Sequence, residues 1–162
     1  MVDFSQIRLL DEIDRAMLDI LQRAGRISNA DLARRVNLSP PATHVRLKRL
    51  EQEGYIDEYV ARLSRTKLGY GMMCYMSIGL QAHQSEELET VRRQLRDMPE
   101  VLECCFVTGE FDYLLKVVLQ DQSDLERFIL RQLSPLPGLA RISTSMVVSE
   151  IKSTTALPVL DE

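Results

Sequence analysis

The chain has 162 residues, of which 45% are hydrophobic and 27% charged, so it is long enough for one medium domain or two small ones. No apolar run approaches the roughly 20 residues that span a bilayer, and the N-terminus lacks the basic-then-apolar order of a signal peptide. We therefore expect a soluble, cytoplasmic protein without a membrane partner. An odd number of cysteines fits that compartment, and we expect Cys74, Cys104 and Cys105 to be reduced packing residues.

The net charge of −4 argues against a nucleic-acid binder, but the charge is unevenly distributed. Residues 1–67 hold 12 Lys and Arg against 10 Asp and Glu, which gives +2, whereas residues 68–162 hold 8 against 14, which gives −6. This asymmetry predicts two modules, of which the basic one faces DNA.

Two short helices are predicted early in the chain. Asp11 is the expected N-cap of the first, whose apolar residues recur at helical spacing. Ser28 can cap the second, and Asp31 three residues later completes a pattern that resembles a capping box.

A third helix follows after a tight turn. Ser39 is the expected N-cap, and Pro40 fits the first helical position because its missing N–H costs nothing there. The helix should run to about Glu53 and end at Gly54. A short helix, a turn and a second helix are the layout of a helix-turn-helix DNA reader.

The basic residues of this region support that interpretation. Residues 32–50 carry five basic side chains and no acid, which favours binding to the phosphates of double-stranded DNA. Helical spacing directs Thr43, Leu47 and Leu50 to the core, with His44 and Arg46 on the flanks. The side chains expected to point away from the domain are Pro41, Ala42, Val45, Lys48 and Arg49. The predicted DNA contacts are Ser28, Asn29, Ser39, Pro41, Ala42, His44, Val45, Arg46, Lys48 and Arg49.

The rest of the chain alternates between strand and helix patterns. Residues 55–63 look extended, as a wing or a linking strand, and residues 64–71 are polar with two glycines, as in a linker. Beyond them we predict strands at 72–80, 101–108, 113–119 and 139–148, a helix at 85–97, and a second helix opened by Ser123 with Glu126.

This order predicts an α+β protein. An N-terminal helix-turn-helix, or winged-helix-like, domain with its linking strand (1–63) and a linker (64–71) precede a ferredoxin-like βαββαβ sandwich (72–162). The helices cover one face of the sheet, and the strands are apolar on nearly every residue, so we expect a second subunit on the other face. A homodimer would bring two DNA-binding heads to one duplex.

Taken together, these features resemble the Lrp/AsnC, or feast/famine, family of bacterial and archaeal transcription regulators. The resemblance is carried by residues 10–15, 25–29, 38–40, 46–51 and 108–115. It implies a DNA-binding regulator that dimerises, assembles further into tetramers or octamers, and is modulated by a small effector, commonly an amino acid, bound between dimers. The implied effector-binding residues are Thr108, Gly109, Glu110, Phe111, Asp112, Tyr113, Ser145 and Val147.

The chemistry of the 108–113 turn fits that role. Gly109 leaves backbone N–H groups free for a carboxylate, and Asp112 or Glu110 could receive an ammonium group. The alternative is a plain hairpin in which Gly109 supplies a positive φ and Asp112 bonds its own backbone. Many relatives carry aspartate after the glycine, whereas this chain has Glu110, so the identity of the ligand stays open.

Two other functions are weighed against this one. The sirohaem decarboxylases resemble the same family, but the chain has no catalytic or metal-binding motif, and the adjacent Cys104 and Cys105 point to opposite faces of a strand. We therefore expect no enzyme, no cofactor and no metal. The second alternative is a ligand-sensing assembly module whose head binds protein, which the acid-free residues 32–50 disfavour.

Overall fold

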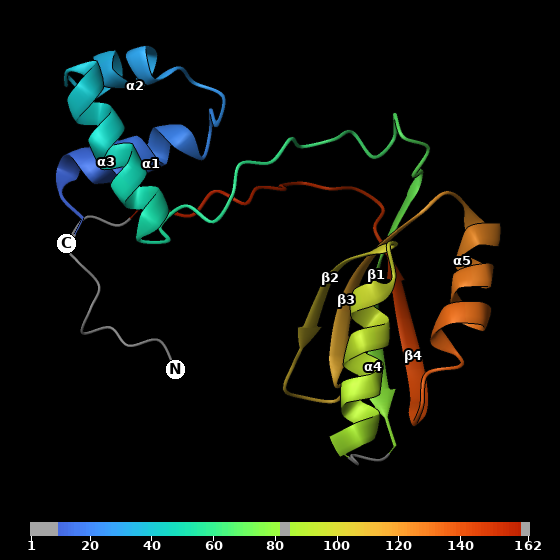
Figure 1. The fold of residues 1–162 in the computed structure, drawn as a ribbon. Helices are drawn as coiled ribbons and strands as arrows, with labels where there is room; N and C mark the ends of the chain where they lie inside the picture. The colour runs from blue at the N-terminus through green and yellow to red at the C-terminus, as the bar shows by residue number, and fades with distance from the viewer. Residues whose placement is uncertain (1–9, 82–84, 160–162) are drawn as a thin grey trace. The chain divides into compact units, whose positions relative to one another are not determined.

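The computed structural model describes residues 10–81 and 85–159 (Figure 1). They divide into a helical unit, residues 10–62 with 152–159, and a sheet unit, residues 63–81 with 85–151. The sequence predicts a second domain over residues 72–162, of which residues 152–159 group with the helices by their contacts. Residues 1–9 and 160–162 of the predicted domains lie outside the described residues.

The helical unit contains the three helices predicted from the sequence, namely α1 (Glu12–Leu21), α2 (Asn29–Arg35) and α3 (Pro40–Gln52). Asp11 caps α1, since its Oδ1 accepts a hydrogen bond from the Asp14 amide at 2.8 Å. Ser28 and Ser39 cap α2 and α3 as expected, and Gly54 follows α3 at a φ of 75°. The core of this unit consists of Met17, Leu21, Leu32, Val36 and Leu50.

Residues 55–63 form no strand in this single chain, so the extended segment predicted there is not paired in a sheet. Side chains rather than a strand ladder hold this segment. The Tyr59 hydroxyl donates to Glu51 at 3.1 Å. The Tyr59 ring packs close to Gly25, where an added Cβ would lie 3.5 Å from ring atom Cδ1. The Arg62 guanidinium donates to the carbonyl and hydroxyl oxygens of Ser153 at 3.1 and 2.8 Å. The segment therefore fastens to α3 and to the C-terminal residues.

Residues 64–71 form a hydrogen-bonded turn rather than an open linker. The Tyr70 amide donates to the Arg65 carbonyl at 2.9 Å, and the Arg65 side chain donates to the Tyr70 carbonyl at 3.1 Å. Gly71 lies so close to the end of β3 that a Cβ on Gly71 would come within 2.9 Å of the carbonyl oxygen of Gln120, the residue after that strand. These contacts make the turn part of the sheet unit.

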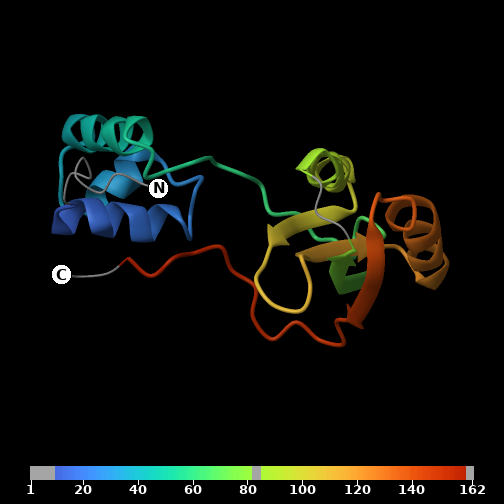
Figure 2. The ribbon, with the colours of Figure 1, turned by 90° about the horizontal axis from the view of Figure 1, so that it is seen from below.

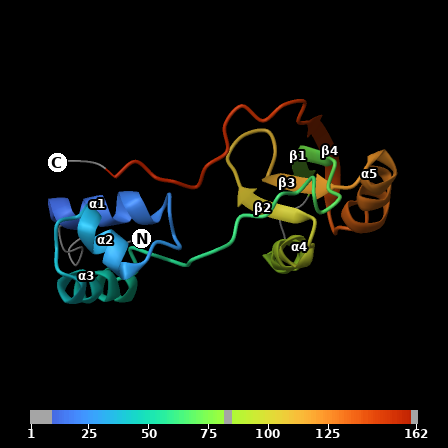
Figure 3. The same cartoon turned by 90° about the horizontal axis from the view of Figure 1, so that it is seen from above.

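The sheet unit has the predicted βαββαβ order. Its strands lie antiparallel in the order β2-β3-β1-β4, which is the ferredoxin-like topology. Seen from below and from above, α4 and the helical segment that begins with α5 lie on one face of the sheet (Figures 2 and 3). The elements are β1 (Met72–Leu80), α4 (Ser85–Asp97), β2 (Val101–Phe106), β3 (Tyr113–Leu119), α5 (Gln122–Phe128), the π-helix η2 (Ile129–Leu133) and β4 (Leu139–Met146).

The two faces of the sheet differ in composition. The helix face is apolar, and its buried residues are Cys74, Met76, Ile78, Tyr113, Leu115, Val117 and Leu119, with Val91, Leu95, Phe128 and Leu133 from the helical segments. The opposite face is less apolar than the sequence predicted. It exposes Tyr75 and Leu114 by 39% and 38%, but also carries the Lys116–Glu103 ion pair.

Three local predictions need correction. The cap of α5 is Asp121, whose side chain accepts from the Asp124 amide at 2.9 Å, and Ser123 lies inside the helix because the chain is still extended at Asp121. β2 and β4 each end two residues earlier than predicted. Cys104 and Cys105 are exposed on the edge strand β2, so only Cys74 is a packing residue. No helix among residues 10–81 and 85–159 is long and apolar enough to cross a membrane.

Candidate DNA-binding face and effector site

One face of α3 is exposed along most of the helix. Its side chains belong to positions that the helical spacing directs outward, and Val45 is 68% exposed. On the opposite side, Thr43 and Leu50 are fully buried, as predicted. The exposed residues of this face, which we call the α3 face, are Pro41, Ala42, His44, Val45 and Lys48.

Arg46 and Arg49 do not belong to the α3 face, because both bind a buried acid on α1. Arg46 Nη1 donates to Asp11 Oδ2 at 2.6 Å and to Asp14 Oδ1 at 2.9 Å, while Arg49 Nη2 donates to Asp14 Oδ2 at 2.5 Å. The Asp14 side chain is 1% exposed, and the arginines are 28% and 25% exposed. A carboxylate in the interior needs compensating cations, so the prediction that Arg49 points away from the domain is wrong.

This ion-pair cluster alters the titration of its members. Burial pushes the pKa of Asp11 upward, but the hydrogen bond from the Asp14 amide and the Arg46 guanidinium outweigh burial and hold it below its ordinary value of 3.8. The pKa of Arg46 is raised, first by its hydrogen bond to Asp11 and then by the bond to Asp14. Asp11 and Arg46 are therefore ionised at neutral pH, and their ion pair joins the start of α1 to α3.

The predicted polar contacts at the ends of α2 and α3 already serve local structure. Ser28 Oγ accepts from the Asp31 amide at 3.1 Å and donates to the Asp31 carboxylate at 2.7 Å. Asn29 Nδ2 donates to the Pro40 carbonyl at 2.9 Å, which ties the start of α2 to the start of α3, and Ser39 Oγ accepts from the Ala42 amide at 3.4 Å. Contact of these three residues with DNA remains a prediction.

The predicted effector turn joins β2 to β3. Gly109 takes a φ of 126°, a conformation that favours glycine, and Thr108 and Glu110 are exposed. Asp112 fixes the turn to the end of β1: its Oδ2 accepts from the Leu80 amide at 2.7 Å, and its own amide donates to the Ile78 carbonyl at 2.8 Å. One oxygen of Asp112 thus has a structural role on the neighbouring strand, not on its own backbone.

Arg141 on β4 reaches the same turn. Its Nη1 donates to Glu110 Oε1 at 2.7 Å, its Nη2 donates to the Glu110 carbonyl, and its guanidinium lies 4.5 Å from the centre of the Phe111 ring. Gly79, opposite Arg141 in the sheet, makes room for this side chain, since a Cβ there would come within 3.0 Å of Arg141 Cγ. An acid, a base and an aromatic ring therefore meet at the turn.

The other predicted effector residues lie elsewhere. Tyr113 is 1% exposed and its side chain is on the helix face of the sheet. Ser145 pairs with Tyr75, and the Val147 amide donates to the Met73 carbonyl at 2.9 Å, near the end of β1 that is remote from the turn. Within one chain the antiparallel register therefore places Ser145 and Val147 several residues from the turn, and their contact with an effector bound between dimers remains a prediction.

Two site residues were missed by sequence reasoning. Asp14 carried a signal, because it precedes Met17 by three residues and Leu21 by seven and so shares their buried helix face. No sequence pattern pointed to Arg141. Only the pairing of β4 with β1 brings Arg141 beside the turn that contains Glu110, 31 residues earlier.

Comparisons with known proteins agree with this arrangement. The family model for the Lrp/AsnC ligand binding domain matches residues 73–157, and that for a winged helix-turn-helix DNA-binding domain matches residues 10–57. The leucine-responsive regulatory proteins of Escherichia coli K12 and Klebsiella pneumoniae are each 36% identical over 148 residues, which cover 91% of this chain and 90% of theirs.

Solved structures give the same result. A transcriptional regulator of Neisseria meningitidis, determined as a complex with L-Met, has a TM-score of 0.90 at 36% identity and covers 93% of this chain and 97% of its own. An AsnC family regulator from Agrobacterium tumefaciens has a TM-score of 0.88 at 32% identity, with the same coverage. The chain belongs to the Lrp/AsnC family of transcriptional regulators, in which a winged helix-turn-helix DNA-binding domain precedes a ligand-binding domain.

Proposed function

We propose that the α3 face enters the major groove of duplex DNA. The observation that carries this proposal is the exposure of Val45 and His44 beside Lys48 on a helix whose own residues include only one acid, near its end. An exposed valine suits a thymine methyl group, the imidazole can bond to a base edge, and the ammonium group suits a phosphate. Arg35 at the end of α2 is exposed and adds a second phosphate contact.

Arg46 and Arg49 act as positioning residues in this proposal. Because both guanidinia are held by Asp14, they fix the rotation of α3 against α1 and so decide which side chains face the groove. Their remaining donors can still reach a phosphate at the edge of the site.

The chain acts as a homodimer that assembles further into a tetramer or an octamer. The support is the sheet face opposite the helices, where Tyr75 and Leu114 remain more than a third exposed in a single chain. Burying this face between two copies pairs the DNA-binding heads and increases their affinity for two half-sites.

The effector is an α-amino acid bound at the 107–112 turn. The ion pair between Glu110 and Arg141 is exposed by 70% and 48%, so it opens at little cost. A zwitterion inserted there gives its carboxylate to Arg141 and its ammonium to Glu110, which replaces one ion pair by two. The relative from Neisseria meningitidis crystallised with L-Met supports an amino-acid ligand.

Effector binding regulates the protein through linkage. A ligand can shift an assembly only if it binds two arrangements with unequal affinity, and a site shared between dimers satisfies that condition. In this proposal the amino acid alters the assembly and thereby the spacing of the DNA-binding heads.

The test of DNA binding is a salt titration. Fluorescence anisotropy with a labelled random-sequence duplex should show log K falling steeply with log salt, and Lys48→Gln should reduce the slope by about 1. Lys67→Gln, which removes an exposed lysine from the sheet unit, is the matched control and should leave the slope unchanged. Equal slopes for the wild type and Lys48→Gln would remove Lys48 from the interface.

A further inference from the structure

The sheet unit contains a cavity that includes none of the turn residues 107–112, although Phe106 and Tyr113 at the two ends of that turn line it. It lies between α4 and β2, has a volume of about 410 Å³, and its walls include Leu95, Val101 and Phe106. This volume falls in the roughly 300–1,000 Å³ range of small-molecule sites. The apolar walls would hold the hydrocarbon part of a ligand.

The charged residues of this cavity are of one sign. Arg92 and Arg96 line it, and none of the described Asp and Glu residues does. Arg92 is partly neutralised by Glu89 at 2.6 Å, but within the described part of the chain Arg96 has no carboxylate at ion-pair distance. The cavity therefore attracts an anion and offers no acid to a cation, unlike the turn, which presents both Glu110 and Arg141.

A buried hydroxyl in the wall points to the same class of ligand. Tyr113 lines the cavity and is 1% exposed, and no described residue accepts the proton of its hydroxyl group. The Arg92 guanidinium, which can only donate, lies beside the hydroxyl oxygen, and this contact raises the pKa of Arg92. A buried polar group without a bond is costly, and a ligand carboxylate between Tyr113 and the arginines would accept its proton.

We propose that this cavity is a second ligand site, which takes a small monocarboxylate with an apolar body and no ammonium group, such as a 2-oxo acid or an aryl-alkanoate. Arg96 and Arg92 bind the carboxylate, the Tyr113 hydroxyl donates to it, and the apolar walls enclose the rest. The site is independent of the amino-acid site at the turn, since the two share no charged residue.

The first test compares two probes that differ mainly in one group. Calorimetric titration of the full-length protein with 3-phenylpropanoate should show binding, and L-phenylalanine should bind this cavity at least about tenfold more weakly because no acid receives its ammonium. Arg96→Gln and Tyr113→Phe should each weaken 3-phenylpropanoate binding, the former by about tenfold.

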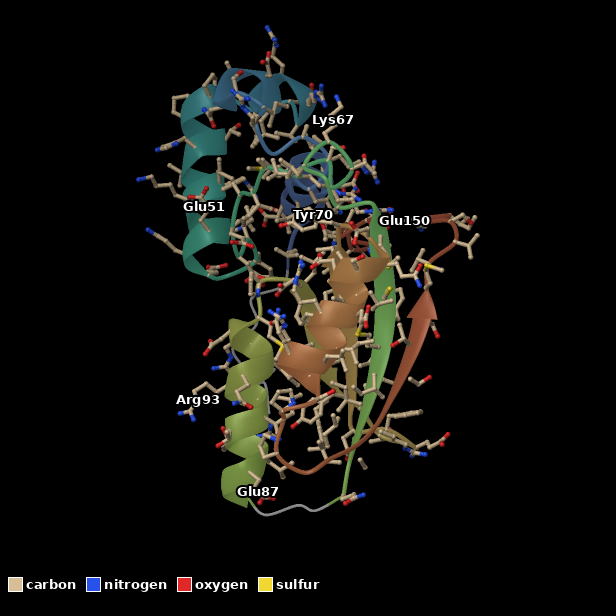
Figure 4. All side chains as sticks on the ribbon, turned by 90° about the vertical axis from the view of Figure 1, so that its right-hand side faces the viewer. Glu51, Lys67, Tyr70, Glu87, Arg93 and Glu150 are labelled. Carbon is tan, nitrogen blue, oxygen red and sulfur yellow. The ribbon has the colours of Figure 1, made fainter. Side chains whose placement is uncertain are left out.

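Two control variants locate the binding. Arg93 is exposed on the outer side of α4 and points away from the sheet (Figure 4). Arg93→Gln removes the same positive charge from α4 as Arg96→Gln does, but Arg93 does not line the cavity. This variant should therefore leave the affinity for 3-phenylpropanoate unchanged. Arg141→Gln, at the turn, should also leave 3-phenylpropanoate binding unchanged.

A chemical footprint gives a readout that does not depend on affinity. Cys104 lines the cavity, whereas the neighbouring Cys105 lies on the opposite face of the strand and both thiols are exposed. Bound 3-phenylpropanoate should slow the alkylation of Cys104 several-fold, measured by peptide mass spectrometry, and leave Cys105 unchanged.

Three results would overturn the proposal: absence of 3-phenylpropanoate binding to the wild-type protein, full binding by Arg96→Gln with loss in Arg141→Gln, or equal protection of both cysteines. None of them bears on DNA binding or on the amino-acid site, which are measured separately by anisotropy and by L-amino-acid titration.

Discussion

Asp14 of α1 binds Arg49 of α3 at 2.5 Å although its side chain is 1% exposed, so a buried charge joins the supporting helix to the proposed recognition helix. Arg46 completes the site from the same side of α3 at 2.9 Å. Such a cluster contributes little net free energy when intact but is costly to break, because a charge is then left without its partner. Its value is geometric, since it fixes the orientation of α3.

Asp14→Asn should destabilise the helical unit by about 3 kcal/mol, the lower end of the range for a broken buried ion pair, because both guanidinia are about a quarter exposed and can regain water. Urea unfolding followed by circular dichroism measures this change. The control is Asp19→Asn on the same helix, whose surface pair with Arg23 should matter by less than about 0.5 kcal/mol. Equal losses in the two variants would contradict a buried ionic joint.

The stability of the helical unit should fall in acid through Asp11. Its pKa is lowered in the folded state, so its ionic stabilisation is complete above the ordinary value of 3.8 and disappears as the pH falls through the lower folded value. Asp11→Asn keeps a good N-cap but removes the charge. Melting temperatures of the two proteins should therefore differ at pH 5 to 6 and converge once the pH falls below the folded pKa of Asp11. A constant difference across this range would rule out the ionic contribution, and Asp57→Asn serves as an exposed control.

Gly79→Ala should separate effector binding from stability. The added methyl group comes within 3.0 Å of Arg141 Cγ and 3.1 Å of its Nε, and Arg141 is a long, 48% exposed side chain that can move. Unfolding free energy should change by less than about 1 kcal/mol, in part because alanine restricts the unfolded chain. The thermal shift caused by an L-amino acid should be lost, as in Arg141→Gln. A variant that retains the shift would show that Arg141 does not bind the ligand.

Gln22→Ala should release the C-terminal segment from the helical unit. The Gln22 amide group makes two hydrogen bonds with the backbone of Leu157, at 2.8 and 2.9 Å, and each contributes about 1 kcal/mol. Hydrogen exchange at the Leu157 amide should accelerate at least tenfold, while α1 to α3 keep their protection. Gln52→Ala, at the exposed end of α3, is the control. Unchanged exchange at Leu157 would mean that these bonds do not hold the segment.

The features predicted correctly from the sequence depend on neighbours along the chain. Ser28, Ser39 and Gly54 mark helix ends because capping involves residues within one turn. The features that were missed join residues far apart: Asp14 with Arg49 across 35 positions, and Glu110 with Arg141 across 31. The sequence alone does not show how α1 packs on α3, so Arg49 looks free to contact DNA. It does not show the register of β4 either, so Glu110 looks as though it had no ionic partner.

The same limit applies to residues 55–63 and to the C-terminal segment. Residues 55–63 include tyrosine, isoleucine and valine, which favour strands, but no described residue of the helical unit pairs with them as a strand, and side chains such as Tyr59 and Arg62 hold them instead. The contact between Gln22 and Leu157 joins residues 135 positions apart. It uses the backbone of Leu157, and a backbone hydrogen bond cannot be predicted from the type of residue at that position.

The return of residues 152–159 to the helical unit makes the sheet unit an insertion within the first one. During synthesis the three helices emerge early, yet the Gln22–Leu157 contact must wait until the whole sheet unit has also been made. A chain that stops before residue 157 therefore carries an incompletely assembled helical unit.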